Sequence, residues 1–257
     1  MSIPVSAPPR VRDLIHSAPD GPVPVVHAGP HAVYVALDGR CVGLLGRDAT
    51  QVPCGLRSRI RSFASWTCRS AYVAGETLHV DHIPLTMGRA VAVQIPMLGQ
   101  GTIPRRAASP ATEAATPQAV VVGLVPRSVA TQVTAVTVGQ LLGRGPGLTP
   151  LGDDVLCGWI ATHRAAGVPT PEIDSAVRAG LHRTTLLSAT LLDCALHGEA
   201  LPELGRFLSA VGTAAEPGRA AELRAVGGTS GAGLLQGARL ALDDLVRTRA
   251  KSEAGAA

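Results

Sequence analysis

Aromatic side chains are scarce in this chain, whose 257 residues include two Trp, two Tyr and two Phe. Ala, Val and Leu must therefore build most of the core, and platforms on which nucleobases could stack are largely missing. The 23 Lys and Arg against 19 Asp and Glu give a formal net charge of +4, without any Lys/Arg run. We therefore expect no nucleic-acid partner, whereas the mild positive excess suits small acidic substrates.

Paired cysteines and long apolar runs are missing as well. The five cysteines form an odd set without a CxxC spacing, which favours a reducing compartment over a disulfide framework or a zinc site. Cys157 follows an acidic pair, but a small buried hydrophobe is its preferred interpretation. Residues 1–9 contain no apolar signal segment, and no run reaches membrane-spanning length. We expect a cytoplasmic protein without a membrane partner.

The first hundred residues are predicted to be rich in β-structure. Two apolar runs flank Asp38-Gly39, which is a strong hairpin signal, and a second pair of runs flanks Gly75-Glu76. Strands are expected over residues 33–37, 41–45, 71–74, 77–80 and 90–95.

Three arginines alternate with other residues between the two predicted hairpins. If the segment is extended, Arg57, Arg59 and Arg61 place three guanidinium groups on one face. A solvated surface is the first interpretation of this row, and an anion site is the alternative.

A change in composition after residue 98 predicts a domain boundary. Glycine and proline, with Ala, Ser and Thr between them, fill the segment from Leu98 to Gln118 as in a linker. Residues 1–98 are therefore expected to form a β-rich domain, 99–118 a linker or long loop, and 119–257 a mainly helical domain. The fold class that follows is α+β.

Apolar residues recur at three- and four-residue spacing in the second half, which predicts amphipathic helices. One helix covers residues 187–196 and should be closed by Gly198. Others are expected within 201–211 and 234–246. The segment 129–142 is β-branched enough for a strand, but helix is favoured there.

The most informative motif runs from Leu142 to Asp154 and reads LGRGPGLTPLGDD. Thr149 and Pro150 are expected to be the N-cap and first residue of a helix. Free N–H groups and a partial positive charge at a helix N-terminus attract phosphate or carboxylate, so the motif predicts an anion site. Either Asp153 or Asp154 would bind Mg²⁺ or a substrate amide. The alternative is that both acids only complement the helix dipole.

Two further segments share this design. His182-Arg183-Thr184-Thr185 combines a guanidinium with two hydroxyls before a helix, which suits an oxyanion. A capping Thr with a surface Arg explains this segment equally well. Residues 227–233, GGTSGAG, again lead into a helix. Together the three segments could surround one anionic ligand, and no Ser–His–Asp or paired-Glu arrangement offers a competing mechanism.

These segments together resemble the AllH family, which is associated with the oxamate carbamoyltransferase of allantoin breakdown in purine degradation. The resemblance rests on Gly143–Asp154, on Arg183-Thr184-Thr185 with Ser188, and on Gly227–Gly231, and it covers about residues 120–245. It implies a subunit that works with two larger protein partners, one related to acyl-CoA synthetases. The complex would move a carbamoyl group between oxalurate and phosphate, giving oxamate and carbamoyl phosphate.

The residues expected to carry this function come from all three segments. Asp153, Asp154 and Arg183 are the catalytic candidates: an Asp would accept hydrogen bonds from the carbamoyl NH₂ or hold a metal, with Mg²⁺ as the candidate, and Arg183 would hold phosphate or carboxylate. Catalysis would consist mainly of positioning and charge stabilisation. The candidate substrate-binding residues are Gly145, Gly147, Thr149, Thr184, Thr185, Thr229, Ser230 and Gly231.

Departures from the family pattern leave alternatives open. Leu151 stands where the family usually has Ser, and Gly228 and Gly233 stand where a larger polar residue and an acid are expected. These changes fit a different substrate, or a subunit whose chemistry lies elsewhere. The alternatives are a non-catalytic assembly or regulatory subunit that binds a phosphorylated metabolite, and an independent metal-assisted small-molecule enzyme.

Overall fold

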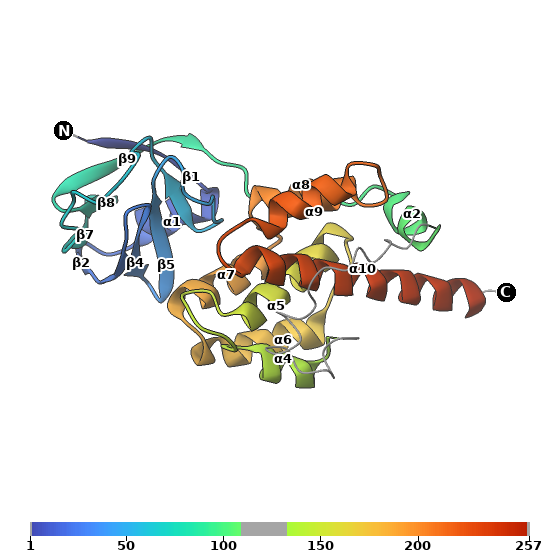
Figure 1. Ribbon diagram of the computed structural model, residues 1–257. Helices are drawn as coiled ribbons and strands as arrows, with labels where there is room; N and C mark the ends of the chain where they lie inside the picture. The colour runs from blue at the N-terminus through green and yellow to red at the C-terminus, as the bar shows by residue number, and fades with distance from the viewer. Residues whose placement is uncertain (1, 109–132, 256–257) are drawn as a thin grey trace. The chain divides into compact units, whose positions relative to one another are not determined.

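The chain forms two compact units in a computed structural model, which describes residues 2–108 and 133–255 (Figure 1). The first unit, Met1–Val93, contains all the described strands, and the second, Gln94–Ala257, is helical. The expected α+β class, with a β-rich first half and a helical second half, is confirmed. The division between the units falls after Val93 in the chain, and helix α2 (Thr102–Ala108) lies inside the range 99–118 for which a linker was expected. Residues 109–132 lie outside the described part of the chain.

The first unit is built on one curved sheet with the strand order β2-β7-β8-β9-β1-β6-β5-β4-β3. Strands β2 and β3 lie at opposite ends of this order although only Pro24 separates them in the chain, so the sheet curls until its ends approach each other. Helix α1 (Pro9–Ser17) packs its buried Val11 and Ile15 into the same core. The strands are β1 (Ile3–Ala7), β2 (Gly21–Val23), β3 (Val25–Ala28), β4 (Ala32–Leu37), β5 (Arg40–Leu45), β6 (Gly55–Arg57), β7 (Ala71–Ala74), β8 (Thr77–Val80) and β9 (Ile83–Ala90).

Both predicted hairpins are confirmed. Strands β4 and β5 pair antiparallel around Asp38-Gly39, and β7 and β8 around Gly75-Glu76. All four turn residues have positive φ, between 46° and 69°, as a two-residue hairpin turn with the right twist requires.

The strand predicted over residues 90–95 is wrong. Strand β9 ends at Ala90, and beyond it only Gln94 forms an isolated bridge, to Glu199. Val93 and Ile95 are buried while their neighbours are exposed. The alternation in the sequence therefore reflects burial of an extended segment that has no continuous strand beside it.

The second unit packs its helices around α5, whose residues are almost all buried. Gly198, with φ of +73°, follows the end of α7 as predicted, and the helices expected within 187–196, 201–211 and 234–246 are confirmed. Within the described part of 129–142, Ala135–Leu141 form a helix, as favoured. The helices are α2, α4 (Ala135–Leu141), α5 (Leu151–Ala165), α6 (Pro171–Gly180), α7 (Leu186–Leu196), α8 (Pro202–Ala210), α9 (Glu216–Arg224) and α10 (Ser230–Gly255), with a 3₁₀ turn η2 (Leu181–Arg183).

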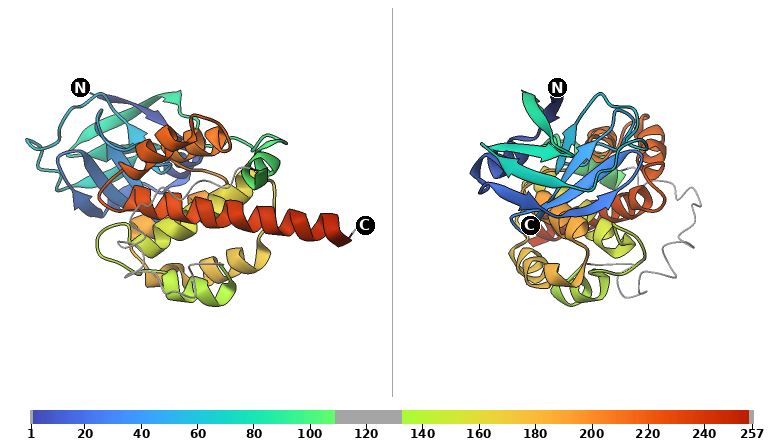
Figure 2. Two further views of the ribbon diagram at one scale, coloured as in Figure 1. Left: turned by 45° about the vertical axis from the view of Figure 1, so that its right-hand side comes forward. Right: turned by 90° about the vertical axis from the view of Figure 1, so that its left-hand side faces the viewer.

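Helices α5 and α10 lie against each other at very short range (Figure 2). A Cβ atom on Gly158 would lie 2.1 Å from the Leu234 carbonyl oxygen, and one on Gly237 would lie 1.9 Å from the Val155 carbonyl oxygen. Only glycine allows this approach, which brings the N-terminal ends of both helices together. In the described residues no helix, the long α10 included, is apolar enough over a sufficient length to cross a membrane.

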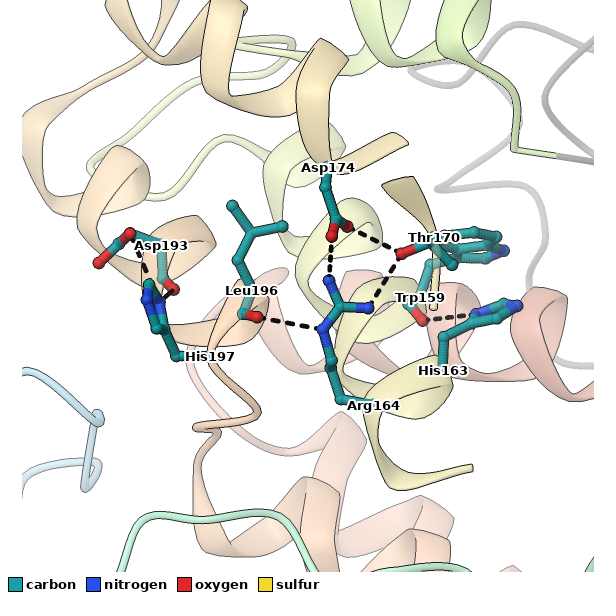
Figure 3. Close-up of polar contacts among 8 residues, drawn as sticks. All are labelled: Trp159, His163, Arg164, Thr170, Asp174, Asp193, Leu196 and His197. Carbon is teal, nitrogen blue, oxygen red and sulfur yellow. Dashed lines mark hydrogen bonds and ion pairs between the residues drawn. The ribbon is translucent and has the colours of Figure 1, made fainter. Parts of the chain in front are cut away.

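Arg164 joins three elements near the end of α5 (Figure 3). Its guanidinium donates from Nε to the Leu196 carbonyl at 3.0 Å, from Nη1 to Thr170 Oγ1 at 3.0 Å and from Nη2 to Asp174 Oδ2 at 2.5 Å. Thr170 Oγ1 in turn donates to Asp174 Oδ1 at 2.8 Å. Because each guanidinium nitrogen has a partner, Arg164 fastens α5 to the start of α6 and the end of α7.

Arg164→Lys is expected to lower the free energy of unfolding by roughly 1–3 kcal/mol, because one ammonium group cannot serve three separated acceptors. Arg206→Lys, at an exposed ion pair with Glu203 on α8, is the control and should change stability by less than about 0.5 kcal/mol. Denaturant unfolding of both variants measures the difference. Equal losses would show that Arg164 contributes no more than a surface ion pair.

Candidate functional site

The first of the three segments connects α4 to α5 and turns on glycines with positive φ: Gly143 at +71°, Gly145 at +120° and Gly147 at +94°. A Cβ atom on Gly143 would lie 2.3 Å from the Arg183 carbonyl oxygen, so the loop packs directly on the backbone of the second segment. The Gly143 N–H donates to Asp153 Oδ1 at 2.8 Å. This end of the loop is therefore held by contacts that only glycine permits.

Helix α5 begins one residue later than predicted. Pro150 occupies the N-cap position with extended backbone and Leu151 is the first helical residue, so the expected capping role of Thr149 is wrong. The Thr149 hydroxyl lies 2.8 Å from Ser230 Oγ instead. This contact connects the first segment to the third.

Asp153 is fully buried and joins the first segment to the second. Besides the Gly143 N–H it accepts hydrogen bonds from the hydroxyls of Thr184 and Ser188, the latter at 2.8 Å. Both of its oxygens therefore have partners. Ser188 is part of the family motif but was not among the predicted site residues. Its position three residues after Thr185, which caps α7, is the signal from which its contact with the site could have been predicted.

Asp154 is 4% exposed and has a different environment. Oδ2 of Asp154 has no hydrogen-bond partner among the described residues. The Asp154 side chain contacts the third segment through a hydrogen bond with Ser230. Burial raises the pKa of Asp154 to about 8, with a smaller rise from Asp153 and an opposing effect of the Ser230 hydrogen bond. At neutral pH this side chain is therefore mostly an uncharged acid, which can donate a hydrogen bond and does not repel an anion.

In the second segment, Thr184 and Thr185 form hydrogen bonds that hold the structure, whereas Arg183 lies on the surface. Thr185 caps α7 by accepting from the Ser188 N–H at 3.1 Å, and its hydroxyl donates to the Leu148 carbonyl at 2.5 Å. Thr184 faces Asp153. Arg183 is exposed and forms no ion pair with any residue that the structure describes. Its Nη1 lies against α4, 3.6 Å from the position that a Cβ on Gly139 would take.

The third segment leads into α10, which begins at Ser230. Gly227 turns with φ of +60°, and Thr229 is exposed. Gly231 is buried, and a Cβ atom there would lie 1.9 Å from the Leu223 carbonyl oxygen. Packing against α9 therefore explains Gly231, while the Ser230 hydroxyl contacts Thr149 of the first segment.

The turns of the first and third segments, which meet at the Thr149–Ser230 contact, contain backbone N–H groups without an acceptor among the described residues. The exposed turns of both segments leave N–H groups that no carbonyl or side chain accepts, and such groups bind phosphate or carboxylate well. Within the described part of the chain, these N–H groups belong to Gly145, Gly147, Leu148, Thr149, Gly228 and Thr229.

The acid pair does not fit a resident Mg²⁺ ion. Mg²⁺ takes six oxygen ligands, whereas both oxygens of Asp153 already accept hydrogen bonds and Asp154 supplies only one further carboxylate. The described residues bring together no group of three or more His, Cys, Asp or Glu side chains. Hydrogen bonding is the chemistry that this pair offers.

Cys157 is buried, as are the other four cysteines, and none of the five is in a disulfide. Burial raises the pKa of the Cys157 thiol well above its usual value, and the nearby Asp154 adds to the effect. Since the thiolate is the nucleophile, Cys157 is a core residue at neutral pH.

Two of the residues that depart from the family pattern, Leu151 and Gly233, lie against each other. A Cβ atom on Gly233 would lie 2.7 Å from Asp154 Cβ and 2.9 Å from Leu151 Cδ1. Leu151 thus fills space that the missing side chain at 233 leaves open. The nearest of these atoms belongs to Asp154, so any side chain at 233 would meet the acid pair whatever residue stands at 151.

Comparison with known proteins agrees with the motif analysis. No curated protein and no solved structure matches the chain. A match to a family model covers a continuous range that contains all three segments. Residues 141–242 match the AllH family, described as oxamate carbamoyltransferase subunit AllH, which confirms the resemblance predicted from the three segments.

Proposed function

We propose that this chain is a subunit of a carbamoyltransferase-like complex and that its helical unit binds a small anionic substrate between the three segments. The family match supports the first part, because its description names an oxamate carbamoyltransferase subunit. The unpaired N–H groups around the Thr149–Ser230 contact carry the second part. Protein partners of that complex follow from the same description.

The chemistry of the site suits carbamoyl phosphate, oxalurate or oxamate. Each has an oxyanion group for the loop N–H groups and the exposed Arg183, and each has an amide that needs hydrogen-bond partners. Asp154, held neutral by burial and joined to the loops through Ser230, can donate to an oxyanion or exchange a proton with an amide. Asp153 acts as a positioning residue that fixes Gly143, Thr184 and Ser188.

The experiment is a calorimetric titration of the full chain with carbamoyl phosphate, with inorganic phosphate and oxamate as comparison ligands. We expect saturable binding that Arg183→Ala weakens about tenfold, because a charge-assisted contact is lost. Arg178→Ala is the matched control. It removes another exposed arginine, from the neighbouring α6, and should leave the affinity within about twofold.

Equal weakening by Arg178→Ala would mean that only net charge attracts the ligand. Absence of binding would remove the substrate site from this chain and leave the assembly role. Carbamoyl transfer that appears only when the partner proteins are added would support a subunit that binds substrate for the complex.

A further inference from the structure

A cavity of about 780 Å³ in the first unit is lined by four arginines and, among the described residues, by no acid. Such a cavity is large enough for a small organic ligand. Two serines lie among its lining residues. The groups that matter are Arg47, Arg57, Arg59, Arg89, Ser6 and Ser58.

Strand pairing places three of these residues side by side in a row that runs across the strands. In the sheet, β1 lies between β9 and β6, and Ser6 of β1 is paired with Arg89 on one side and Arg57 on the other. Directly paired residues share a face of the sheet, and neighbouring strands are about 4.8 Å apart. The two arginines therefore start from backbone positions about 10 Å apart, with the Ser6 hydroxyl between them.

The positive charge of the cavity is not balanced within the unit. Arg57 donates to the neutral acceptors Gln51 Oε1 at 3.4 Å and the Arg47 carbonyl at 3.3 Å, which orient it without neutralising it. In the described chain no ion pair involves Arg47, Arg59 or Arg89. Four like charges around one cavity repel one another, and an anion inside would relieve this repulsion.

Only part of this site could be predicted from the sequence. Strand β6 ends at Arg57, so the alternation of Arg57, Arg59 and Arg61 does not continue as one extended face. Arg61 does not line the cavity, whereas Arg47 and Arg89 come from distant positions.

We propose that this cavity binds a small polyanion with several linked phosphate or carboxylate groups, a site separate from the loops of the helical unit. Four arginines carry more positive charge than a single phosphate neutralises, whereas several linked oxyanions can balance it. No aromatic side chain lines the cavity, so recognition would rest on charge and shape, without base stacking.

The test is calorimetric titration of the full chain with tripolyphosphate, citrate and orthophosphate. Tripolyphosphate or citrate should bind at least about tenfold more tightly than orthophosphate, and the preferred one identifies the class of oxyanion. Arg59→Ala and Arg89→Ala should each weaken binding about tenfold. Added salt should weaken it further because the charges are exposed.

Arg61→Ala is the matched control, since Arg61 is exposed, carries the same charge and lies two residues from Arg59 outside the cavity. Its affinity should stay within about twofold of the wild type. Loss of affinity in Arg61→Ala equal to that in Arg59→Ala would overturn the proposal, as would the absence of saturable binding of either polyanion. All three arginines belong to the first unit, so the result does not depend on the substrate site of the helical unit.

Discussion

Gly237→Ala should destabilise the helical unit by roughly 3 kcal/mol, although alanine is the better helix former. A Cβ atom at this position would lie 1.9 Å from the Val155 carbonyl oxygen and 2.8 Å from the Trp159 nitrogen. Both are backbone atoms of α5, so no side-chain rotation can relieve the overlap. The two helices would have to separate, which exposes core residues along their whole contact.

Gly218→Ala is the control for this prediction. Gly218 lies on α9, is exposed, and has no atom within 4 Å of the position that a Cβ would take. Its substitution should stabilise the protein by up to about 1 kcal/mol through helix propensity alone. Denaturant unfolding followed by the circular dichroism of the helices measures both variants. A stability of Gly237→Ala equal to or above that of the wild type would show that the close α5–α10 contact does not form.

The local features of this fold could be predicted from the sequence where local chemistry decides them. Asp38-Gly39 has the positive φ that its hairpin demands, and Gly198 follows α7 as its composition predicts. The interpretation of residues 90–95 and of the Thr149 cap failed for a common reason. In each case a distant segment decided the outcome, Glu199 for Gln94 and Ser230 for the Thr149 hydroxyl.

The grouping of the three segments could be predicted from the sequence, but the environments of their residues could not. Shared chemistry at three helix starts was sufficient to group the segments, and Thr149, Thr184 and Ser230 are indeed linked to one another or to the acid pair. The difference between Asp153 and Asp154 could not be predicted. Asp153 contacts Thr184 and Ser188 whereas Asp154 contacts Ser230, so residues far along the chain give two adjacent, identical side chains different environments.

The free energy of unfolding should fall as the pH rises from about 4 to about 8, and Asp154→Asn should remove most of this fall. Burial raises the pKa of Asp154 from 3.8 to about 8, so in this window the folded state holds a proton that the unfolded state releases. Asp154 therefore contributes stability that is fully present below about pH 4 and is lost as the pH rises through its folded value. The maximum slope is about 1.4 kcal/mol per pH unit, which makes the full loss about 6 kcal/mol as an upper bound.

Unfolding curves of the wild type and the variant at a series of pH values measure this effect as a difference. The comparison is needed because burial lowers the pKa of His163, which gives stability the opposite trend near neutral pH and is present in both proteins. Glu172→Gln, at an exposed position on α6, is the charge-matched control and should keep the wild-type pH dependence. A wild type and an Asp154→Asn variant with parallel pH profiles would mean that Asp154 is ionised in the folded protein at neutral pH. The proposed anion site would then contain a buried negative charge beside its ligand, and the neutral-acid role in carbamoyl transfer would have to be abandoned.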